Sequence, residues 1–483
     1  MPVSNTNIGE LPAWEVSDLP SPPPPTFRHK LRMAGPGAIL LAISIGAGEW
    51  LIGPAAAVLY GPAILGIVTL GIVLQVFFNL EAIRYTLFTG EPIYGGFLRL
   101  KPGPRFWTPF YIGLVFLQQG WPALAASAAV TLVASVKGRL PTAADTSFVN
   151  CVAALLYVIA LLLLSFGGTV ERMLEILTKT MVGLILTFLL VVNLLFVPWE
   201  VWLRTFLGFF QLSGLGGSVD WALVGALAAT AGAGGLPNLT ITNWMRDKGY
   251  GMGALTGAIP SAFGGSHAQV SHFGKIFELT ADNLDRWKRW TSYVHFDQIW
   301  FWAVGAFGGM FLNVNLATGV VPIGTQMSQM GIGVYQAKYM AESLWAGFWP
   351  LALLNGFWTL FSTQLGNTDM VARTVTDLLW MGNDRVRNWG GGKIQHIYYT
   401  IMVLYTVAGI CVVWLATPLT LLKIIANLGG VVMVIGGIQI FLVNRRFIPR
   451  PLQASWWRQV GLLACVAFYA AFAGRVLLSL WGR

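Results

Sequence analysis

Long runs of apolar residues, separated by short polar connections, recur along almost the whole chain. About 20 apolar residues are enough for a helix to cross the hydrocarbon core of a bilayer. Eleven such segments are present, at residues 34–59, 61–86, 107–136, 148–166, 173–198, 220–247, 293–317, 341–380, 397–417, 418–442 and 457–480. The pattern predicts an all-α polytopic membrane protein with 11 transmembrane helices. The segment at 341–380 turns polar after Ser362 and is long enough to continue as a helix into the cytoplasm.

Composition supports this class. Of the 483 residues, 55% are hydrophobic and only 10% are charged, against roughly 25% charged residues in soluble domains. Water-soluble globular proteins and disordered proteins are therefore excluded. In a membrane protein, the net charge of +10 is typical of basic cytoplasmic loops, so we do not expect a nucleic-acid partner.

The basic residues also indicate orientation, because cytoplasmic loops carry the excess of Lys and Arg. With the N-terminus inside, Arg84, Lys179 and Lys423 lie within spans. Few basic residues then fall outside, namely Lys137, Arg139, Arg204, Lys338, Arg475 and Arg483. We predict a multi-pass protein of the cell membrane with a cytoplasmic N-terminus and an extracytoplasmic C-terminus. Residues 1–30, which are rich in proline, are expected to be a flexible cytoplasmic leader, and residues 31–483 a single transmembrane domain.

Two spans carry glycine clusters near their centres. The first contains G-A-G-E at residues 46–49, and the sixth contains A-G-A-G-G-L-P-N at residues 231–238. Glycine disfavours a helix interior, and Pro237 cannot donate a helical hydrogen bond. We therefore expect both helices to unwind there. The alternative is close helix packing through small residues, which is common in membranes.

The spacing of these two interruptions points to internal symmetry. They lie five helices apart, which predicts an inverted repeat of helices 1–5 against helices 6–10, with helix 11 as an addition. Paired interruptions in corresponding helices mark the binding site of many secondary transporters. Non-helical backbone at membrane depth survives only where protein buries it or where it lines a wet cavity.

Glu49 places a carboxyl group at the first interruption. A charged group at the bilayer centre costs at least about 2.5 kcal/mol, so it is a candidate functional residue. Burial favours the neutral form of a carboxyl group, so Glu49 is a candidate proton carrier as well as a cation ligand. Alternatively, Glu49 forms a fixed ion pair with a partner such as Lys423 in the tenth span.

Other polar residues allow two interpretations. The four after the second interruption could offer ligand oxygens or cap the half-helix, and they are Asn238, Thr240, Thr242 and Asn243. Asp369 and Arg373, one turn apart, are expected to form a local pair. His267 and His272 lie in a Gly/Ser-rich loop and are expected to be solvated. We find no H-E-x-x-H, P-loop or nucleophile-elbow motif, so neither an enzyme nor a cofactor is predicted.

Three short motifs lie where spans begin or end. G-P-G at residues 35–37 opens the first span, R-Y-T-L-F-T-G-E at 84–91 ends the second, and M-L-E at 173–175 precedes the fifth. In order and spacing they resemble the Nramp family of proton-coupled divalent metal transporters, which have the LeuT fold. The resemblance extends over most of the chain and implies a LeuT-like fold and a transport function.

The metal-binding motifs of that family do not match. Where the family has Asp-Pro-Gly-Asn in span 1, this chain has Gly46 and Glu49 in place of the Asp and Asn ligands. In span 6, aligning on Asn238 puts G-L-P at residues 235–237 over the family's Met-Pro-His, and Thr242 replaces a second histidine. A thioether ligand favours transition metals over Mg²⁺ and Ca²⁺, so its loss removes the reason to expect a manganese or iron carrier.

The leading hypothesis is an Nramp-related secondary transporter with an altered site. Its substrate-binding residues are predicted to be Gly46, Ala47, Glu49, Gly234, Gly235 and Asn238, and Glu49 would also couple transport to protons. The substrate would be a hard divalent cation such as Mg²⁺, or a small cationic or zwitterionic solute. A solute predicts aromatic walls, for which Trp50, Trp121 and Trp300 are candidates. The alternative is a non-transporting membrane receptor or scaffold with a collapsed cavity.

Overall fold

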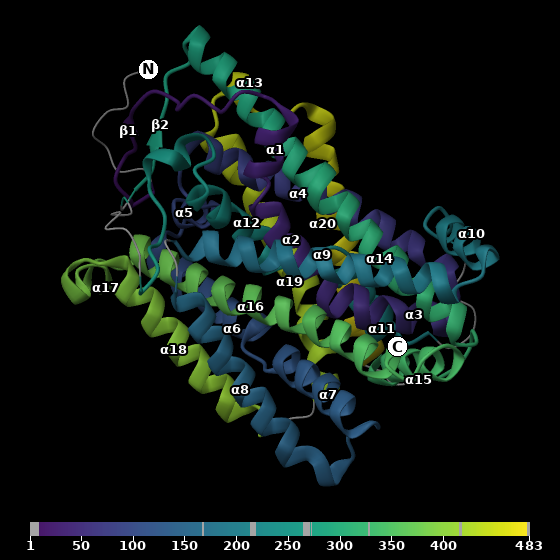
Figure 1. The fold of residues 1–483 in the computed structure, drawn as a ribbon. Helices are drawn as coiled ribbons and strands as arrows, with labels where there is room; N and C mark the ends of the chain where they lie inside the picture. The colour runs from purple at the N-terminus through teal and green to yellow at the C-terminus, as the bar shows by residue number, and fades with distance from the viewer. Residues whose placement is uncertain are drawn as a thin grey trace.

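The computed structural model describes residues 9–166, 169–212, 219–263, 271, 273–326, 329–414 and 418–480. Long helices dominate these residues and pack side by side in an elongated bundle (Figure 1). The helices that follow the predicted spans are α2 (Pro36–Ser44), α3 (Gly53–Tyr60), α4 (Leu65–Thr89), α6 (Pro104–Gln119), α7 (Ala123–Lys137), α8 (Thr146–Ser165), α9 (Val170–Phe196), α11 (Trp221–Thr230), α12 (Leu236–Asp247), α13 (Ala281–His295), α14 (Val304–Val320), α16 (Phe348–Gly382), α18 (Ile394–Val412), α19 (Pro418–Phe447) and α20 (Trp456–Leu480).

Among the described residues, nine helical segments are long and apolar enough to cross a membrane. The sixth predicted span falls outside this set because it is divided into the short helices α11 and α12. The eighth, α16, carries many polar residues. The all-α membrane class is therefore confirmed, while the count of 11 spans stays a prediction.

The shorter elements lie at the two ends of the bundle. They are α1 (Phe27–Met33), α5 (Ile93–Leu98), α10 (Trp199–Gly208), α15 (Gln329–Ser343), α17 (Asp384–Arg387) and the paired strands β1 (Glu15–Val16) and β2 (Lys275–Ile276). Figure 1 shows β1, β2, α5 and α17 at one end, and α10 and α15 at the other. Two segments predicted to be cytoplasmic contact each other where Lys30 donates to Ser292, and Arg84, near the end of the second span, donates to the Leu452 carbonyl.

The described part of the N-terminal leader makes specific contacts with the helical bundle, while its flexibility stays a prediction. The Trp14 ring lies 4.3 Å from the Arg99 guanidinium. Trp290 of α13 donates to the Pro20 carbonyl over 2.8 Å, and the Leu19 backbone amide donates to Asn283 over 3.2 Å. A proline-rich segment has few backbone donors but many carbonyl acceptors, and α13 supplies donors for them. The described part of the leader therefore packs against the end of the helical bundle.

The long helix α16 runs through the centre of the bundle, as a single 35-residue helix. Its polar half is enclosed by other helices, since Asp369, Arg373 and Asp377 are all buried within the protein. It contacts α7, α18, α6, α9 and α2. This surrounding protein explains why the polar half of α16 is stable in the interior, because buried polar groups need internal partners.

The third predicted span also contains an interruption. It is divided at residues 120–122, G-W-P, between α6 and α7. Pro122 has no backbone N–H to donate. The break directly follows Gln118 and Gln119, two buried amides.

Candidate functional site

The sixth span unwinds between α11 and α12, as predicted. Ala231 is extended, with φ −61° and ψ 112°, and Gly232, Gly234 and Gly235 have φ of +87°, +59° and +94°. Such positive φ values favour glycine over every residue with a Cβ. The A-G-A-G-G sequence therefore encodes the break directly.

Two glutamines satisfy the unwound backbone. The Gln75 side chain of α4 accepts hydrogen bonds from the amides of Ala233 and Gly234 over 3.0 and 3.2 Å and donates to the Ala231 carbonyl over 2.5 Å. Gln118 of α6 accepts from the Leu236 amide over 3.1 Å and donates to the Gly234 carbonyl over 3.2 Å. Because no water is available in hydrocarbon, these amides replace the missing helical partners.

The first span is interrupted less than the sixth. Its backbone widens into a π-helix over Ile45–Ile52, and only Gly46, with ψ −106°, leaves the helical region. A Cβ on Gly46 would lie 1.8 Å from the Thr363 hydroxyl, and one on Gly48 would lie 2.3 Å from the Thr230 carbonyl oxygen. Glycine at both positions thus permits close approach of the first span to α16 and to α11.

A small cavity lies where these elements meet, with a volume of about 50 Å³. The two interruptions contribute Gly48, Gly232, Ala233, Gly234 and Pro237. The polar side chains of its lining are Ser44, Gln118, Gln119, Thr230, Thr363 and Asn367, and the remaining residues are Ile43, Leu124, Ile425 and Ala426. Among the described residues, the lining therefore contains hydroxyls and amides but no ionisable and no aromatic side chain.

Glu49 lies beside this cavity rather than in its lining. The side chain is fully buried, and a Cβ on Gly309 of α14 would lie 2.6 Å from one carboxylate oxygen. Neither oxygen has a hydrogen-bond partner among the described residues. The Lys423 side chain lies outside the described part of the structure, so the proposed ion pair stays a prediction.

Asn238 connects the second interruption to a second buried acid. Its amide donates to Gln75 and, over 2.9 Å, to Asn79, and Asn79 donates to Gln298 over 2.9 Å. Gln298 donates to Asp297 over 2.7 Å, and Asp297 also accepts from the Gly37 amide over 3.0 Å. Asp297 lies in the π-helical stretch Phe296–Ala303 of the seventh span. A chain of amides thus leads from the interruption to this carboxyl group.

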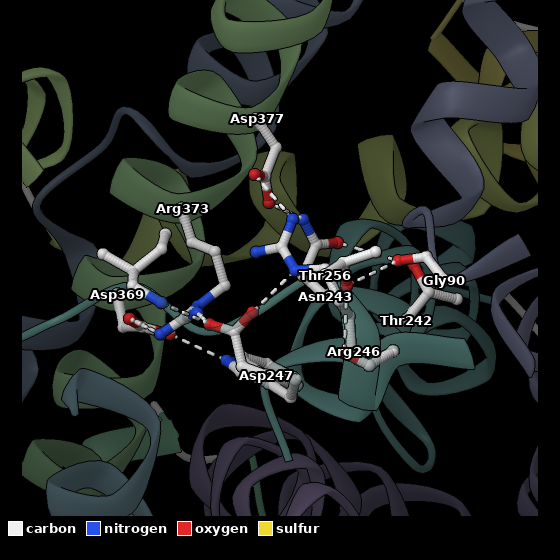
Figure 2. Close-up of polar contacts among 12 residues, drawn as sticks. Gly90, Thr242, Asn243, Arg246, Asp247, Thr256, Asp369, Arg373 and Asp377 are labelled. Carbon is white, nitrogen blue, oxygen red and sulfur yellow. Dashed lines mark hydrogen bonds and ion pairs between the residues drawn. The ribbon is translucent and has the colours of Figure 1, made fainter. Parts of the chain in front are cut away.

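A buried ion-pair network joins α12 to α16 (Figure 2). Asp247 pairs with Arg373 and, over 2.7 Å, with Arg246. Arg373 also pairs with Asp369, as predicted, and Arg246 with Asp377, each over 2.8 Å. Further side chains complete the network: Trp244 of α12 and Tyr398 of α18 donate to Asp369, and Asn243 of α12 donates to Asp377.

The remaining predicted candidates have structural partners or lie elsewhere. Thr240 bonds with Thr374, and Thr242 accepts from the Ile93 amide, so neither lines the cavity or caps α12. The predicted aromatic walls do not occur at the cavity: Trp50 packs against Gly356 of α16, Trp121 donates to the Leu117 carbonyl, and Trp300 is 68% exposed. The Ala47 side chain, His267 and His272 lie outside the described residues.

Several residues of the site were missed at the level of sequence. Gln75 and Asn79 lie four residues apart on one face of α4, inside an apolar run. Asp297 stands in the apolar seventh span, and the argument that selected Glu49 applies to it equally. The G-W-P break would have drawn attention to Gln118.

Within the described ranges, no group of three or more His, Cys, Asp or Glu residues could hold a metal ion. Dehydrated divalent cations such as Mg²⁺ and Ca²⁺ are bound through carboxylates, often with water. None of the described residues that line the cavity carries a carboxylate.

Comparison with known proteins extends this description. No protein-family model and no curated protein matches the chain. Solved structures do: a manganese transporter of Eremococcus coleocola, in complex with an aromatic bis-isothiourea substituted compound, aligns over 92% of this chain and 86% of its own, with a TM-score of 0.60 and 12% identity. Mhp1, a transporter of the nucleobase-cation-symport-1 family with bromovinylhydantoin bound, aligns over 92% and 93%, with a TM-score of 0.53 and 13% identity. The chain therefore has a LeuT-like fold.

Proposed function

We propose that this protein is a secondary transporter for a small cationic or zwitterionic solute, with Glu49 as the group that couples transport to protons. The observation that carries the proposal is the neutral polar cavity formed by both helix interruptions. Paired interruptions of this kind form the substrate site of transporters with inverted repeats. We also propose that the chain is a divergent relative of the Nramp family. This relation would explain the three motifs at residues 35–37, 84–91 and 173–175.

The lining favours a solute over a bare divalent metal. Mg²⁺ is usually bound through one or two carboxylates, which the described lining does not offer, whereas amides and hydroxyls suit the hydrogen-bonding groups of a small solute. Next to residues of the lining, the Glu49 carboxylate and the side-chain oxygen Oδ1 of Asn238 are buried acceptors that lack partners among the described residues. An excess of unpaired acceptors favours a ligand that donates hydrogen bonds or carries positive charge.

The size of the cavity requires movement during transport. A volume of about 50 Å³ has room for a few waters only, since one water needs about 10–15 Å³ of such space. A solute can enter only if the first and sixth spans separate from their neighbours. Movement of one repeat against the other is the way in which such folds provide alternating access.

Ligand binding to the purified protein tests the proposed substrate class. The thermal unfolding midpoint would be measured with choline, glycine betaine and alanine as organic probes, and with Mg²⁺ and Mn²⁺ as metal probes. A ligand that binds only the folded state raises the midpoint. We expect an organic probe to do so, with Thr363→Val weakening the effect. Stabilisation by Mn²⁺ or Mg²⁺ alone would overturn the solute assignment.

The second candidate function is a receptor or scaffold that has kept the fold. The small volume of the cavity is the observation that favours it, because a collapsed cavity was its prediction. Binding of an organic probe without any uptake into proteoliposomes would identify a receptor. Uptake would identify a transporter.

A further inference from the structure

We infer that a second site, at the end of the bundle formed by α1, α13 and the start of α20, binds an anionic phosphate group. Figure 1 shows these three helices close together. A pocket of about 590 Å³ lies among them, and its cationic lining consists of Lys30, Arg84, Lys288 and Arg458, with His295 beside them. None of the described residues that line this pocket is Asp or Glu.

The positive charge of this basic pocket is only partly neutralised. Glu81 behind it pairs with Arg84 and with Arg458, each over 2.8 Å, so two guanidinium groups share one carboxylate. Lys30 donates to the neutral Ser292 hydroxyl over 3.0 Å. Lys288 is exposed and adds a further positive charge.

Arg458 carries an additional indication of a ligand. Only 9% of this residue is exposed, and its buried Nε has no hydrogen-bond partner among the described residues. A buried donor without a partner costs about 1–3 kcal/mol, and more for a charged group. Arginine and lysine are the residues that recognise phosphate, through charge-assisted hydrogen bonds.

The surroundings of the pocket suit a phosphate at a membrane surface. Trp300 lines the pocket and is 68% exposed, and Trp456 and Trp457, at the start of α20, are 75% and 52% exposed. Exposed tryptophans are typical of the headgroup level of a bilayer. Basic pockets between helices on the cytoplasmic side bind anionic lipid headgroups, although a soluble phosphate has the same chemistry.

A titration of the purified protein in detergent tests this site and distinguishes the two sources. The unfolding midpoint would be followed with phosphatidylglycerol, with phosphatidylcholine as the neutral lipid, and with inorganic phosphate. We expect phosphatidylglycerol to raise the midpoint and phosphatidylcholine not to. An equal rise with inorganic phosphate would assign the site to soluble phosphates, and no rise with either anion would overturn the proposal.

Variants locate the effect in the basic pocket. Lys30→Ala with Lys288→Ala should weaken the apparent affinity for the anion by about 30-fold, because each basic residue near an anionic surface contributes about a fivefold factor. Lys288→Ala alone replaces an exposed side chain, so it should fold normally. It should weaken the apparent affinity for the anion about fivefold. Arg385→Ala with Lys393→Ala removes the same charge from another exposed segment and should leave the affinity unchanged. Equal weakening by both pairs would contradict a defined site.

Discussion

The two polar regions inside this protein differ in how their charges are used. In the network between α12 and α16, every Asp and Arg has an oppositely charged partner. Around the small cavity, the lining is neutral and Glu49 is buried without a partner among the described residues. The two regions share helix α12, which begins at the cavity and ends in the network.

This difference separates two roles of buried polarity. Paired charges hold two helices together, because removing either partner leaves a buried charge without compensation. An unpaired carboxyl group can exchange a proton or respond to a ligand. We therefore expect substitutions in the network to change stability and substitutions near the cavity to change function.

Breaking the network should have the largest effect. Asp247→Ala leaves Arg373 and Arg246 without a shared partner, and we expect a loss of about 3–5 kcal/mol in the free energy of unfolding, measured by thermal or denaturant unfolding. Glu342→Ala is the matched control, because it breaks a pair with Lys338 in which both side chains are about two-thirds exposed. It should cost less than about 1 kcal/mol.

Removing the amide that supports the unwound segment should rank second. Gln75→Leu keeps a similar volume but leaves the amides of Ala233 and Gly234 unpaired, at about 1–3 kcal/mol for each buried group. Gln459→Leu removes a single bond to the Ala454 carbonyl and serves as the control in the same unfolding experiment. Equal losses in both variants would contradict the supporting role of Gln75.

Crowding the contact between the first and sixth spans should have a smaller effect. Gly48→Ala places a methyl group 2.3 Å from the Thr230 carbonyl oxygen, and overpacking of this kind costs about 1–3 kcal/mol. Gly113→Ala places its methyl group in open space on α6 and should stabilise the helix by up to about 1 kcal/mol. Unfolding midpoints that shift in the same direction would contradict this close approach.

Acidification should weaken a third polar cluster, which is centred on Glu91 just after the end of the second span. Burial raises the pKa of Glu91, but Arg99 and the hydrogen bonds from Arg99, Tyr85 and Gly274 outweigh it, so the pKa lies below its usual value. A lowered pKa in the folded state stabilises the fold above the unfolded pKa, and this stability is lost as the pH falls through the folded value. Glu91→Gln should therefore reduce the dependence of unfolding on pH below about 4.5, and unchanged curves would contradict this.

The sequence predicted the parts of the molecule that follow local rules. The apolar runs predicted the helices. The sequence A-G-A-G-G at 231–235 predicted the break, because glycine readily adopts positive φ. The partners of Gln75 and Gln118 could not be assigned, because they are 116 or more residues away in the chain. The direction of the Glu49 side chain also depends on packing, here against Gly309, which no local pattern encodes.

The most direct test of the account is uptake into proteoliposomes under an imposed pH gradient. Choline, glycine betaine and alanine would be compared with Mg²⁺ and Mn²⁺, using wild type, Glu49→Gln and the surface control Glu342→Gln. The account predicts that uptake of an organic probe follows the gradient in wild type and Glu342→Gln, and that Glu49→Gln abolishes this dependence. Uptake that responds to the gradient equally in all three proteins, or uptake of metal alone, would contradict it.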